Sequence, residues 1–188
     1  MTVPITLIPD FITNPSDAFA VLNQELDWVR IANTPRSEYY CNDFPEPYFY
    51  GTPEFGRAYQ VQPWHPEILA IRQALEAHTG SVFEVCFLNR YLDQKDQLGW
   101  HSDNSPEMDD ARPIGIISLG VEREIWFKEI GADNSPENIT KVKLPHGSLC
   151  LMHAGMQDTH LHRIPKASFI CGTRISLTFR GYVQRIEG

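Results

Sequence analysis

The 188-residue chain has few cysteines and no pair of them at the spacing of a zinc or redox motif. Three of the four, Cys86, Cys150 and Cys171, lie in apolar stretches, and the fourth is Cys41. Isolated cysteines in apolar surroundings are typical of buried, reduced thiols. The sequence therefore excludes a disulfide scaffold and favours a reducing compartment, so we expect a cytoplasmic protein.

The chain also lacks the hydrophobic segments of a membrane or secreted protein. No apolar run approaches the roughly 20 residues of a membrane-spanning helix. The first ten residues contain no basic side chain and are interrupted by Pro4 and Pro9, which is unlike a signal peptide. We expect a globular monomer with no membrane partner, formed by a single domain over residues 1–188.

Positive charge is scarce, and the formal net charge is −8. Residues 1–60 contain eight acidic residues and three arginines, whereas residues 160–186 contain five basic residues and no acidic one. A nucleic-acid-binding protein usually carries a broad basic surface. The charge pattern leaves a modest basic edge near the C-terminus and argues against a groove for duplex DNA.

Helical periodicity is found only in the first half of the chain. One helix is expected to begin with Asn14 as N-cap and Pro15 in the first turn, and to end before Pro35. A second is expected to follow Pro66 and to end at Gly80. Their apolar faces consist of Phe19, Leu22, Leu26 and Val29 in the first helix and Ile68, Ile71 and Leu75 in the second.

Most of the remaining sequence has the period of two that is typical of strands. Residues 34–64 are rich in aromatic residues, proline and glycine, and predict short strands or a hairpin with an exposed aromatic loop. This order of elements predicts a mainly β fold, a double-stranded β-helix or jelly-roll flanked by N-terminal helices. Helices and an aromatic lid would occupy about residues 1–80, and the jelly-roll residues 81–183. Its strands are expected at 83–91, 114–119, 124–127, 144–152, where the strand follows a Pro-His-Gly turn, and 174–182.

A candidate metal site begins at His101 and Asp103, which share one face of a strand because side chains alternate. Two histidines and a carboxylate bind a divalent metal on one side and leave the other side open, which suits non-haem Fe(II) oxygen chemistry. The second histidine must come from another strand. The candidates are His146, His153, His160 and His162, and periodicity does not choose between the last two because they share a face.

The last expected strand places polar and apolar residues on opposite faces. Such a strand usually turns its polar face to water. Beside a metal site the polar face would instead point into the jelly-roll, which is costly unless an anion neutralises its arginines. A small dicarboxylate cosubstrate next to the metal would meet that need. The polar face consists of Arg174, Ser176, Thr178 and Arg180.

Four segments, taken in order along the chain, resemble the AlkB family of dioxygenases that depend on Fe(II) and 2-oxoglutarate. They are Asn89-Arg90-Tyr91, His101-x-Asp103, His162-x-Ile164-Pro165 and Arg174-x5-Arg180. The resemblance covers roughly residues 35–181. It implies an enzyme that uses Fe(II), 2-oxoglutarate and O2.

The resemblance also implies roles for individual residues. Iron ligands would be His101, Asp103 and His162, and His162 is preferred to His160 because of the segment that it opens. Arg174 would bind the distal carboxylate of 2-oxoglutarate. Arg180 would lie near the iron ligands, as part of the catalytic centre. The cosubstrate contacts besides Arg174 would be Asn89, Tyr91, Ser176 and Arg180.

The aromatic lid lies where AlkB-family enzymes bind their substrate. Stacking on aromatic side chains suits a base extruded from its strand, although closing the barrel mouth as an apolar patch is an alternative role. Ser105 departs from the family, because repair enzymes have an acid at this position. The candidate substrate contacts are Arg36, Tyr48, Phe49, Tyr50 and Ser105. Core packing is expected of Phe83, Val85, Phe87, Trp64, Trp100 and Trp126.

Three functions are compatible with these patterns. The first is oxidative dealkylation of N-alkylated nucleobases in DNA or RNA, on single-stranded or short substrates because the surface is acidic. The second keeps the chemistry and changes the substrate to a protein side chain, a free nucleotide or a small metabolite. The third is a non-catalytic jelly-roll binding module, or a zinc hydrolase with the same three ligands, although no His-Glu-x-x-His helix supports a hydrolase.

Overall fold

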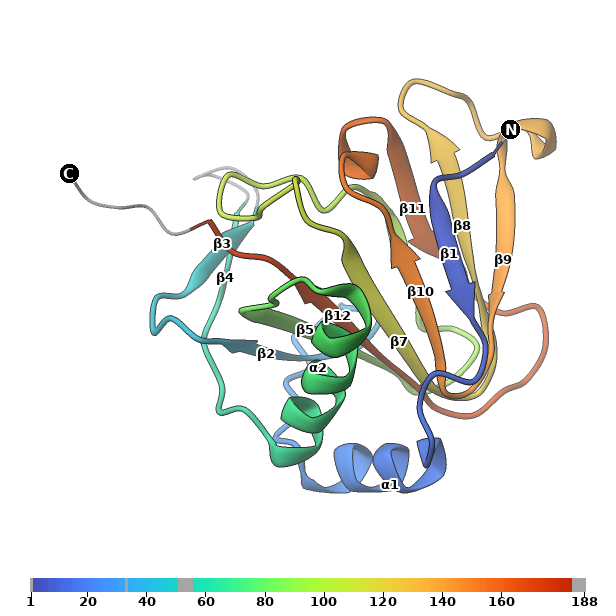
Figure 1. Ribbon diagram of the computed structural model, residues 1–188. Helices are drawn as coiled ribbons and strands as arrows, with labels where there is room; N and C mark the ends of the chain where they lie inside the picture. Colours follow the sequence, from blue (N-terminus) through green and yellow to red (C-terminus); the bar gives the residue numbers. More distant parts are fainter. Residues whose placement is uncertain (1, 33, 51–55, 184–188) are drawn as a thin grey trace.

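The computed structural model describes residues 2–32, 34–50 and 56–183, without the side chain of Tyr50, and these form three antiparallel sheets and two α-helices (Figure 1). The large sheet has the strand order β1 (Ile5–Ile8), β10 (Ser148–Met152), β7 (Ile114–Gly120), β12 (Arg174–Arg180), β5 (Val85–Tyr91) and β2 (Ser37–Asn42). The small sheet has the order β6 (Leu98–His101), β11 (His160–Ile164), β8 (Arg123–Glu129) and β9 (Thr140–Leu144). The hairpin is formed by β3 (Tyr48–Tyr50) and β4 (Arg57–Tyr59).

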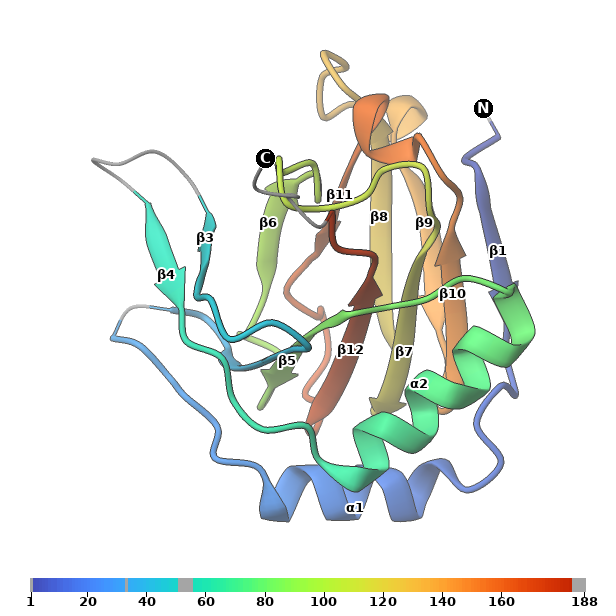
Figure 2. The same ribbon diagram turned by 60° about the vertical axis from the view of Figure 1, so that its left-hand side comes forward.

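The two helices, α1 (Pro15–Glu25) and α2 (Pro66–Thr79), cover the outer face of the large sheet (Figure 2). The second helix ends at Gly80, whose φ of 71° is the left-handed conformation expected of a C-terminal glycine. Leu75 is fully buried over β7, where an added Cβ on Gly115 would lie 2.6 Å from its Cδ2 atom. The absence of a side chain at Gly115 therefore lets α2 pack directly onto the sheet.

Strand β12 is buried on both of its faces. One face contributes Ile175, Leu177 and Phe179 to the apolar cluster beneath the helices. The other face turns its polar residues, including the fully buried Arg174, into the interior. A second apolar cluster there joins the two sheets through residues such as Ile116 of β7 and Phe127 of β8. The expected jelly-roll with helices on one side is thus confirmed, and its central strand carries an internal polar face.

The first helix is shorter than predicted. Its apolar spacing continues to Val29, but the helix ends at Glu25 and Leu26 is extended, with φ −81° and ψ 138°. Val29 is 48% exposed and pairs through its backbone with Glu38 of β2. Backbone pairing with the sheet therefore overrides the helical pattern in this segment.

Three features of the strand prediction differ from the structure. The strand expected within 144–152 is β10, which begins only at Ser148, after the expected Pro-His-Gly turn, in which Gly147 has φ 82°. The strand at Ile5–Ile8 and most of the strand at Thr140–Leu144 were not expected. Both are edge strands of their sheets, with partly exposed residues.

Two tryptophans lie outside the apolar core in which they were expected. Trp100 and Trp126 are half-buried on the outer face of the small sheet, where cationic side chains cover their rings. Trp64 packs against the cluster beneath the helices, as expected. Phe83 belongs to that same cluster, whereas Phe87 points to the opposite side of the large sheet. These differences arise because strand β5 begins at Val85 and because outward positions of the small sheet also accept large aromatic residues.

The cysteines and the helices bear on two expectations from the sequence, namely reduced thiols and the lack of a membrane-spanning segment. All four cysteines are free; Cys41, Cys86 and Cys150 are buried and Cys171 is half-buried, while their reduced state stays a prediction. None of the helices among the described residues has the length and apolar character needed to cross a membrane.

Replacing the side chain that seats α2 on the sheet tests this packing. Leu75→Ala is expected to lower the free energy of unfolding by about 2–5 kcal/mol, because it leaves a cavity above Gly115. Denaturant unfolding followed by circular dichroism measures the loss. Val82→Ala is the control, since Val82 is 51% exposed and should change stability by less than about 0.5 kcal/mol. Equal losses in the two variants would contradict the packing described.

Candidate metal and cosubstrate site

Two histidines and one carboxylate meet where β6 and β11 lie side by side. His101 ends β6 and His162 is its direct partner on β11, whereas Asp103 lies in the loop after β6, so the expectation that it shares a strand with His101 was wrong. One ligand atom from each of the three residues lies within 4.8 Å of the others. Asp103 Oδ1 is 3.6 Å from His101 Nε2, and Asp103 Oδ2 is 3.6 Å from His162 Nε2. The three groups therefore converge on one point, as the ligands of a single ion would.

Strand register distinguishes the two histidines that periodicity left equivalent. His162 pairs with His101, whereas His160 pairs with Glu129 on β8. The His160 ring contacts Thr159 Oγ1 at 2.8 Å, and His160 is not part of the metal-ligating group. The arrangement in space thus favours His162, which the family resemblance had also favoured.

Neighbouring polar groups orient two of the three ligands. His101 Nδ1 lies 2.9 Å from the carbonyl oxygen of Gly99, and a proton on Nδ1 leaves the Nε2 lone pair facing Asp103. The backbone N–H of Asp103 donates to Oε1 of the buried Gln157 at 2.8 Å. Sequence reasoning missed Gln157, because no pattern links a residue before β11 to the loop after β6.

Burial sets the protonation of the three ligands. It lowers the pKa of His162 to about 3, with a further lowering from neighbouring His101, and it also lowers the pKa of His101. Burial alone would raise the pKa of Asp103, but Arg180 and the two histidines outweigh it, so the net shift is downward. At neutral pH the site therefore holds two neutral imidazoles and one carboxylate, the forms that bind a metal.

Arg174 is a buried cation with no carboxylate partner among the described residues. Its Nη2 atom donates to Ser118 Oγ on β7 at 2.8 Å, while Nε and Nη1 have no hydrogen-bond partner in the described part of the chain. Burial lowers its pKa to about 10. A buried guanidinium with unpaired donors is costly, and a carboxylate is its natural partner.

The other predicted cosubstrate contacts surround Arg174. Tyr91 is its direct partner on β5, and the tyrosine ring lies 5.4 Å from the guanidinium carbon. Ser176 is flanked by Asn89 on β5 and Ser118 on β7. The structure therefore brings all the predicted residues of β5 and β12 onto one polar patch, and adds Ser118, which sequence reasoning missed.

Arg180 connects β12 to the metal-ligating group. Its Nη2 atom donates to Asp103 Oδ1 at 2.5 Å, and its guanidinium carbon lies 5.2 Å from the centre of the Phe87 ring. Arg180 as a whole residue is 9% exposed. Arg180 thus holds the Asp103 carboxylate from the side of the large sheet, while the histidines face it from the small sheet.

A cavity of about 110 Å³ opens beside His101 and Asp103, two of the three ligands. Its aromatic wall is formed by Tyr48, Tyr59 and Phe87, with Tyr48 and Tyr59 stacked at 6.0 Å between ring centres. Tyr59 and Phe87 were not predicted, because the spacing on β5 suggested core packing for Phe87 and Tyr59 lies on a short strand without a motif. The full lining is Arg36, Glu38, Tyr48, Tyr59, Phe87, Asn89, Leu98, His101, Asp103 and Arg180.

Glu38 is a buried carboxylate in the cavity wall and is held by two arginines. It is 4% exposed, lies 2.8 Å from Arg36 and also pairs with Arg57. Arg36 in turn donates from Nε to Asn89 Oδ1 at 2.9 Å. Arg36 therefore links the cosubstrate patch to β2, and the cavity has a second acid besides the ligand Asp103, which comes from β2 rather than from the position of Ser105.

The predicted substrate residues do not all reach the cavity. Arg36 and Tyr48 line it. Phe49 lies at the alternate position of β3 and is 64% exposed, and Ser105 is buried in the loop but does not line the cavity. The side chain of Tyr50 lies outside the described residues.

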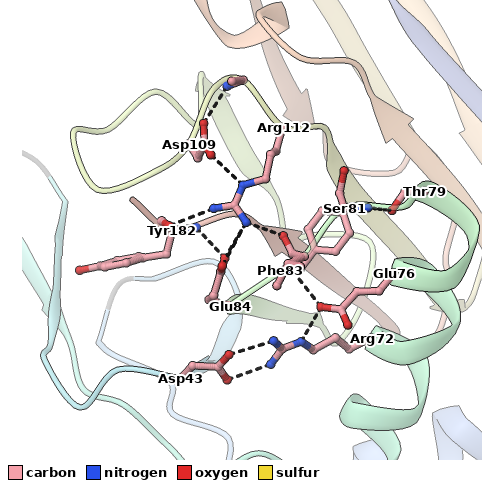
Figure 3. Close-up of polar contacts among 12 residues, drawn as sticks. Asp43, Arg72, Glu76, Thr79, Ser81, Phe83, Glu84, Asp109, Arg112 and Tyr182 are labelled. Atoms are coloured by element: carbon pink, nitrogen blue, oxygen red, sulfur yellow. Dashed lines mark hydrogen bonds and ion pairs between the residues drawn. The ribbon is translucent and has the colours of Figure 1, made fainter. Parts of the chain in front are cut away.

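The loop that follows Asp103 is fastened by Arg112, as the close-up shows (Figure 3). Arg112 donates to Asp109 Oδ2 at 2.8 Å, to Glu84 Oε2 at 3.0 Å and to the carbonyl oxygen of Tyr182 at 2.9 Å. These contacts join the loop to the start of β5 and to the residues after β12. The position of Asp103 is therefore supported by both sheets and by its own loop.

Comparison with known proteins agrees with the geometry. A family model described as the 2OG-Fe(II) oxygenase superfamily matches residues 17–180. The solved structure titled "The structure of OsALKBH1" is similar in fold, with a TM-score of 0.65 and 18% sequence identity. The similarity covers 96% of this chain and 99% of that one.

Curated relatives match over a shorter region. "Alpha-ketoglutarate-dependent dioxygenase alkB homolog 3" of Bos taurus is 35% identical over 122 residues, which is 62% of this chain and 43% of that protein. "DNA oxidative demethylase ALKBH2" of Homo sapiens is 31% identical over 129 residues, which is 66% of this chain and 49% of that protein. The match therefore spans less than half the length of each of these relatives.

Substitution of the two neighbouring histidines tests the ligand set. His162→Ala is expected to abolish Fe(II) binding, measured by anaerobic calorimetry, because only His162 faces the Asp103 carboxylate from β11. His160→Ala is the matched control on the same face of the same strand and should bind Fe(II) as the unmodified protein does. Loss of binding in His160→Ala with retention in His162→Ala would contradict the arrangement.

Removal of the unpaired buried cation tests the cosubstrate patch. Arg174→Ala is expected to weaken 2-oxoglutarate binding by about 1.5–3 kcal/mol, the scale of a lost hydrogen bond to a charged group. Calorimetry with Mn(II)-loaded protein measures the affinity. Arg90→Ala is the control, since Arg90 lies on the other face of β5 and stacks on Trp28. An unchanged affinity in Arg174→Ala would rule out this patch.

Proposed function

The chain belongs to the 2OG-Fe(II) oxygenase superfamily, and we propose that it is an AlkB-like dioxygenase that removes alkyl groups from nucleobases by oxidation. One observation carries the proposal. A three-residue metal-ligating group lies on the same internal surface as a buried arginine that has no carboxylate partner among the described residues. An open metal site beside an anion site is the arrangement that a metal and a dicarboxylate require together.

The residues present fit both groups. His101, Asp103 and His162 supply neutral nitrogen and carboxylate ligands, which suit Fe(II) and leave the cavity side of the metal open. Arg174 supplies two unpaired donors for the distal carboxylate of 2-oxoglutarate. When bound with O2, the metal and cosubstrate supply the oxidation of a C–H bond.

The protein's own residues hold and orient these partners. Asn89, Tyr91 and Ser176 would complete the cosubstrate site around Arg174, and Ser118 keeps that guanidinium in place. Arg180 would fix the Asp103 carboxylate so that it keeps one orientation during the reaction. The buried walls exclude water from the reacting atoms.

The cavity wall indicates a flat, aromatic substrate. Tyr48, Tyr59 and Phe87 offer ring faces and edges on which a nucleobase can stack. A base held there would present its N-alkyl group to the open side of the metal. Hydroxylation of the carbon bonded to nitrogen gives an unstable product, which releases an aldehyde and restores the base.

The names of the matched relatives and the net charge of the chain further support the proposed class of substrate. The matched relatives are named as a dioxygenase of the alkB homolog group and as a DNA oxidative demethylase. A single-stranded or short substrate is favoured, because the chain has a net charge of −8 and few cations are free to bind duplex DNA. A monomeric state and a cytoplasmic location stay predictions. The alternative substrates are a free nucleotide, a protein side chain and a small metabolite.

Turnover of methylated oligonucleotides tests the proposal. Single-stranded DNA and RNA containing N1-methyladenine or N3-methylcytosine should yield formaldehyde and succinate in equal amounts. His101→Ala should yield neither. Consumption of 2-oxoglutarate without formaldehyde from any methylated oligonucleotide would contradict base dealkylation and direct attention to the alternative substrates.

Two neighbouring aromatic residues of β3 test the substrate wall. Tyr48→Ala is expected to weaken binding of the methylated oligonucleotide by about 1–3 kcal/mol, because a stacking face is lost. The weaker binding would be seen as a higher KM. Phe49→Ala, on the other face of the same strand, should leave KM nearly unchanged. Equal effects of the two substitutions would show that the cavity wall is not the binding surface.

A further inference from the structure

A line of alternating tryptophans and cations crosses the outer face of the small sheet. We call it the cationic ladder; it consists of Trp100, Trp126, Lys128, Lys141 and Arg163. Arg163 lies over both indole rings, at 5.5 Å from Trp100 and 5.3 Å from Trp126. Lys128 lies 5.1 Å from Trp100, and Lys141 lies 4.4 Å from Trp126.

Strand alternation explains why the ladder backs onto the metal site. Arg163, Trp126 and Lys141 are direct partners across β11, β8 and β9. Their neighbours His162 and Phe127 point inward, to the metal-ligating group and the core. Trp100 likewise precedes the ligand His101 on β6. The ladder and the proposed active site are therefore the two faces of one sheet.

The ladder holds cations that no carboxylate neutralises within ion-pair distance among the described residues. Lys128 donates to neutral acceptors, the carbonyl oxygen of Ala132 and the Asn134 side chain, and the Asp133 carboxylate interacts with it electrostatically from beyond ion-pair distance. Neighbouring Lys143 differs, because it pairs with Glu122 at 3.5 Å. Four of the five lysines of the chain lie on β8, on β9 or just after β11, at positions 128, 141, 143 and 166.

Most arginines near the cavity are, by contrast, already paired with acids. Glu38 forms ion pairs with both Arg36 and Arg57, and Asp103 forms an ion pair with Arg180. A phosphate would have to displace these carboxylates to bind there. Further arginines are paired in the same way, namely Arg30 with Asp96, Arg72 with Asp43 and Arg112 with Glu84.

We propose that the cationic ladder binds the phosphate backbone of a single-stranded nucleic acid whose alkylated base occupies the cavity. The inference rests on the proposed function and adds a second contact surface to it. The indole rings are covered by cations, so the ladder offers fixed positive charges to phosphates rather than ring faces to bases. Stacking on the rings also holds the long side chains in place, which reduces the entropy that they lose on binding.

The topology gives a single-stranded nucleic acid a route from the cavity to the cationic ladder. β6 is the edge strand of the small sheet, and Figure 2 shows it on the side of that sheet that faces the β3–β4 hairpin. Leu98 and His101 of β6 line the cavity together with Tyr48 and Tyr59 of the hairpin. A nucleic acid strand that leaves the cavity over the β6 edge therefore reaches Trp100, where the ladder begins.

Salt-dependent binding of unmodified single-stranded DNA tests the ladder independently of catalysis. Fluorescence anisotropy is recorded with an oligonucleotide longer than about 16 nucleotides, the upper end of single-strand site sizes. Lys128→Gln and Lys141→Gln should each lower the slope of log K against log salt by about 0.7, and each should weaken binding about fivefold at 0.1 M salt. Lys95→Gln removes the same charge from an exposed turn outside the ladder and should change neither quantity.

Arg163 requires a variant that keeps the sheet folded. Arg163→Lys retains the charge and should bind as the unmodified protein does, whereas Arg163→Gln should lower the salt slope; melting curves show whether each is folded. If the ladder variants bind like Lys95→Gln, or if the unmodified protein does not bind single-stranded DNA, the inference is overturned.

Substrate length separates this inference from the proposed function. The double variant Lys128→Gln/Lys141→Gln should lose turnover of a long methylated oligonucleotide at limiting concentration and keep turnover of a methylated trinucleotide. Equal turnover of the long substrate by the double variant and the unmodified protein would contradict the binding role of the ladder. It would not affect the proposal that the protein dealkylates bases. Ladder-dependent DNA binding without turnover of any methylated base would instead overturn dealkylation.

Discussion

The burial of two arginines on the inner face of β12 is the constraint on which the site depends. A guanidinium removed from water is costly unless a negative charge or several acceptors meet it. Arg180 meets the Asp103 carboxylate at 2.5 Å, and this contact places an acid between two histidines of the opposite sheet. Arg174 donates to Ser118 and lies against the Tyr91 ring, and its Nε and Nη1 atoms stay without a hydrogen-bond partner among the described residues, which leaves donors for the carboxylate of a cosubstrate.

The fold makes this placement possible by covering the other face of the same strand. Leu177 and its apolar neighbours on β12 pack beneath the two helices, so the strand is anchored by one face and free to carry polar groups on the other. The large sheet supplies Asn89, Tyr91 and the arginines, and the small sheet supplies both histidines. The metal and the cosubstrate would therefore be held from opposite walls, and the loop fastened by Arg112 connects the walls at Asp103.

Local patterns predicted the parts of the molecule that depend on neighbours in sequence. Proline and glycine marked both ends of α2, and strand alternation placed Arg174 and Arg180 on one face. Pairing between distant strands was not accessible in the same way. Periodicity left His160 and His162 equivalent, and only the family resemblance or the register of β11 against β6 separates them; Gln157, Ser118 and Glu38 reach the site from segments that carry no motif. The outward tryptophans were misplaced for the same reason, since the cations that cover them lie on other strands.

The central claim is that one internal surface holds both a divalent metal and 2-oxoglutarate. A crystal structure of the protein with Mn(II) and 2-oxoglutarate, with the metal located by anomalous scattering, tests it most directly. We expect a single metal peak ligated by His101 Nε2, Asp103 and His162 Nε2, with the distal carboxylate of 2-oxoglutarate on Arg174. A metal bound through His160, or a cosubstrate carboxylate bound away from Arg174, would contradict it.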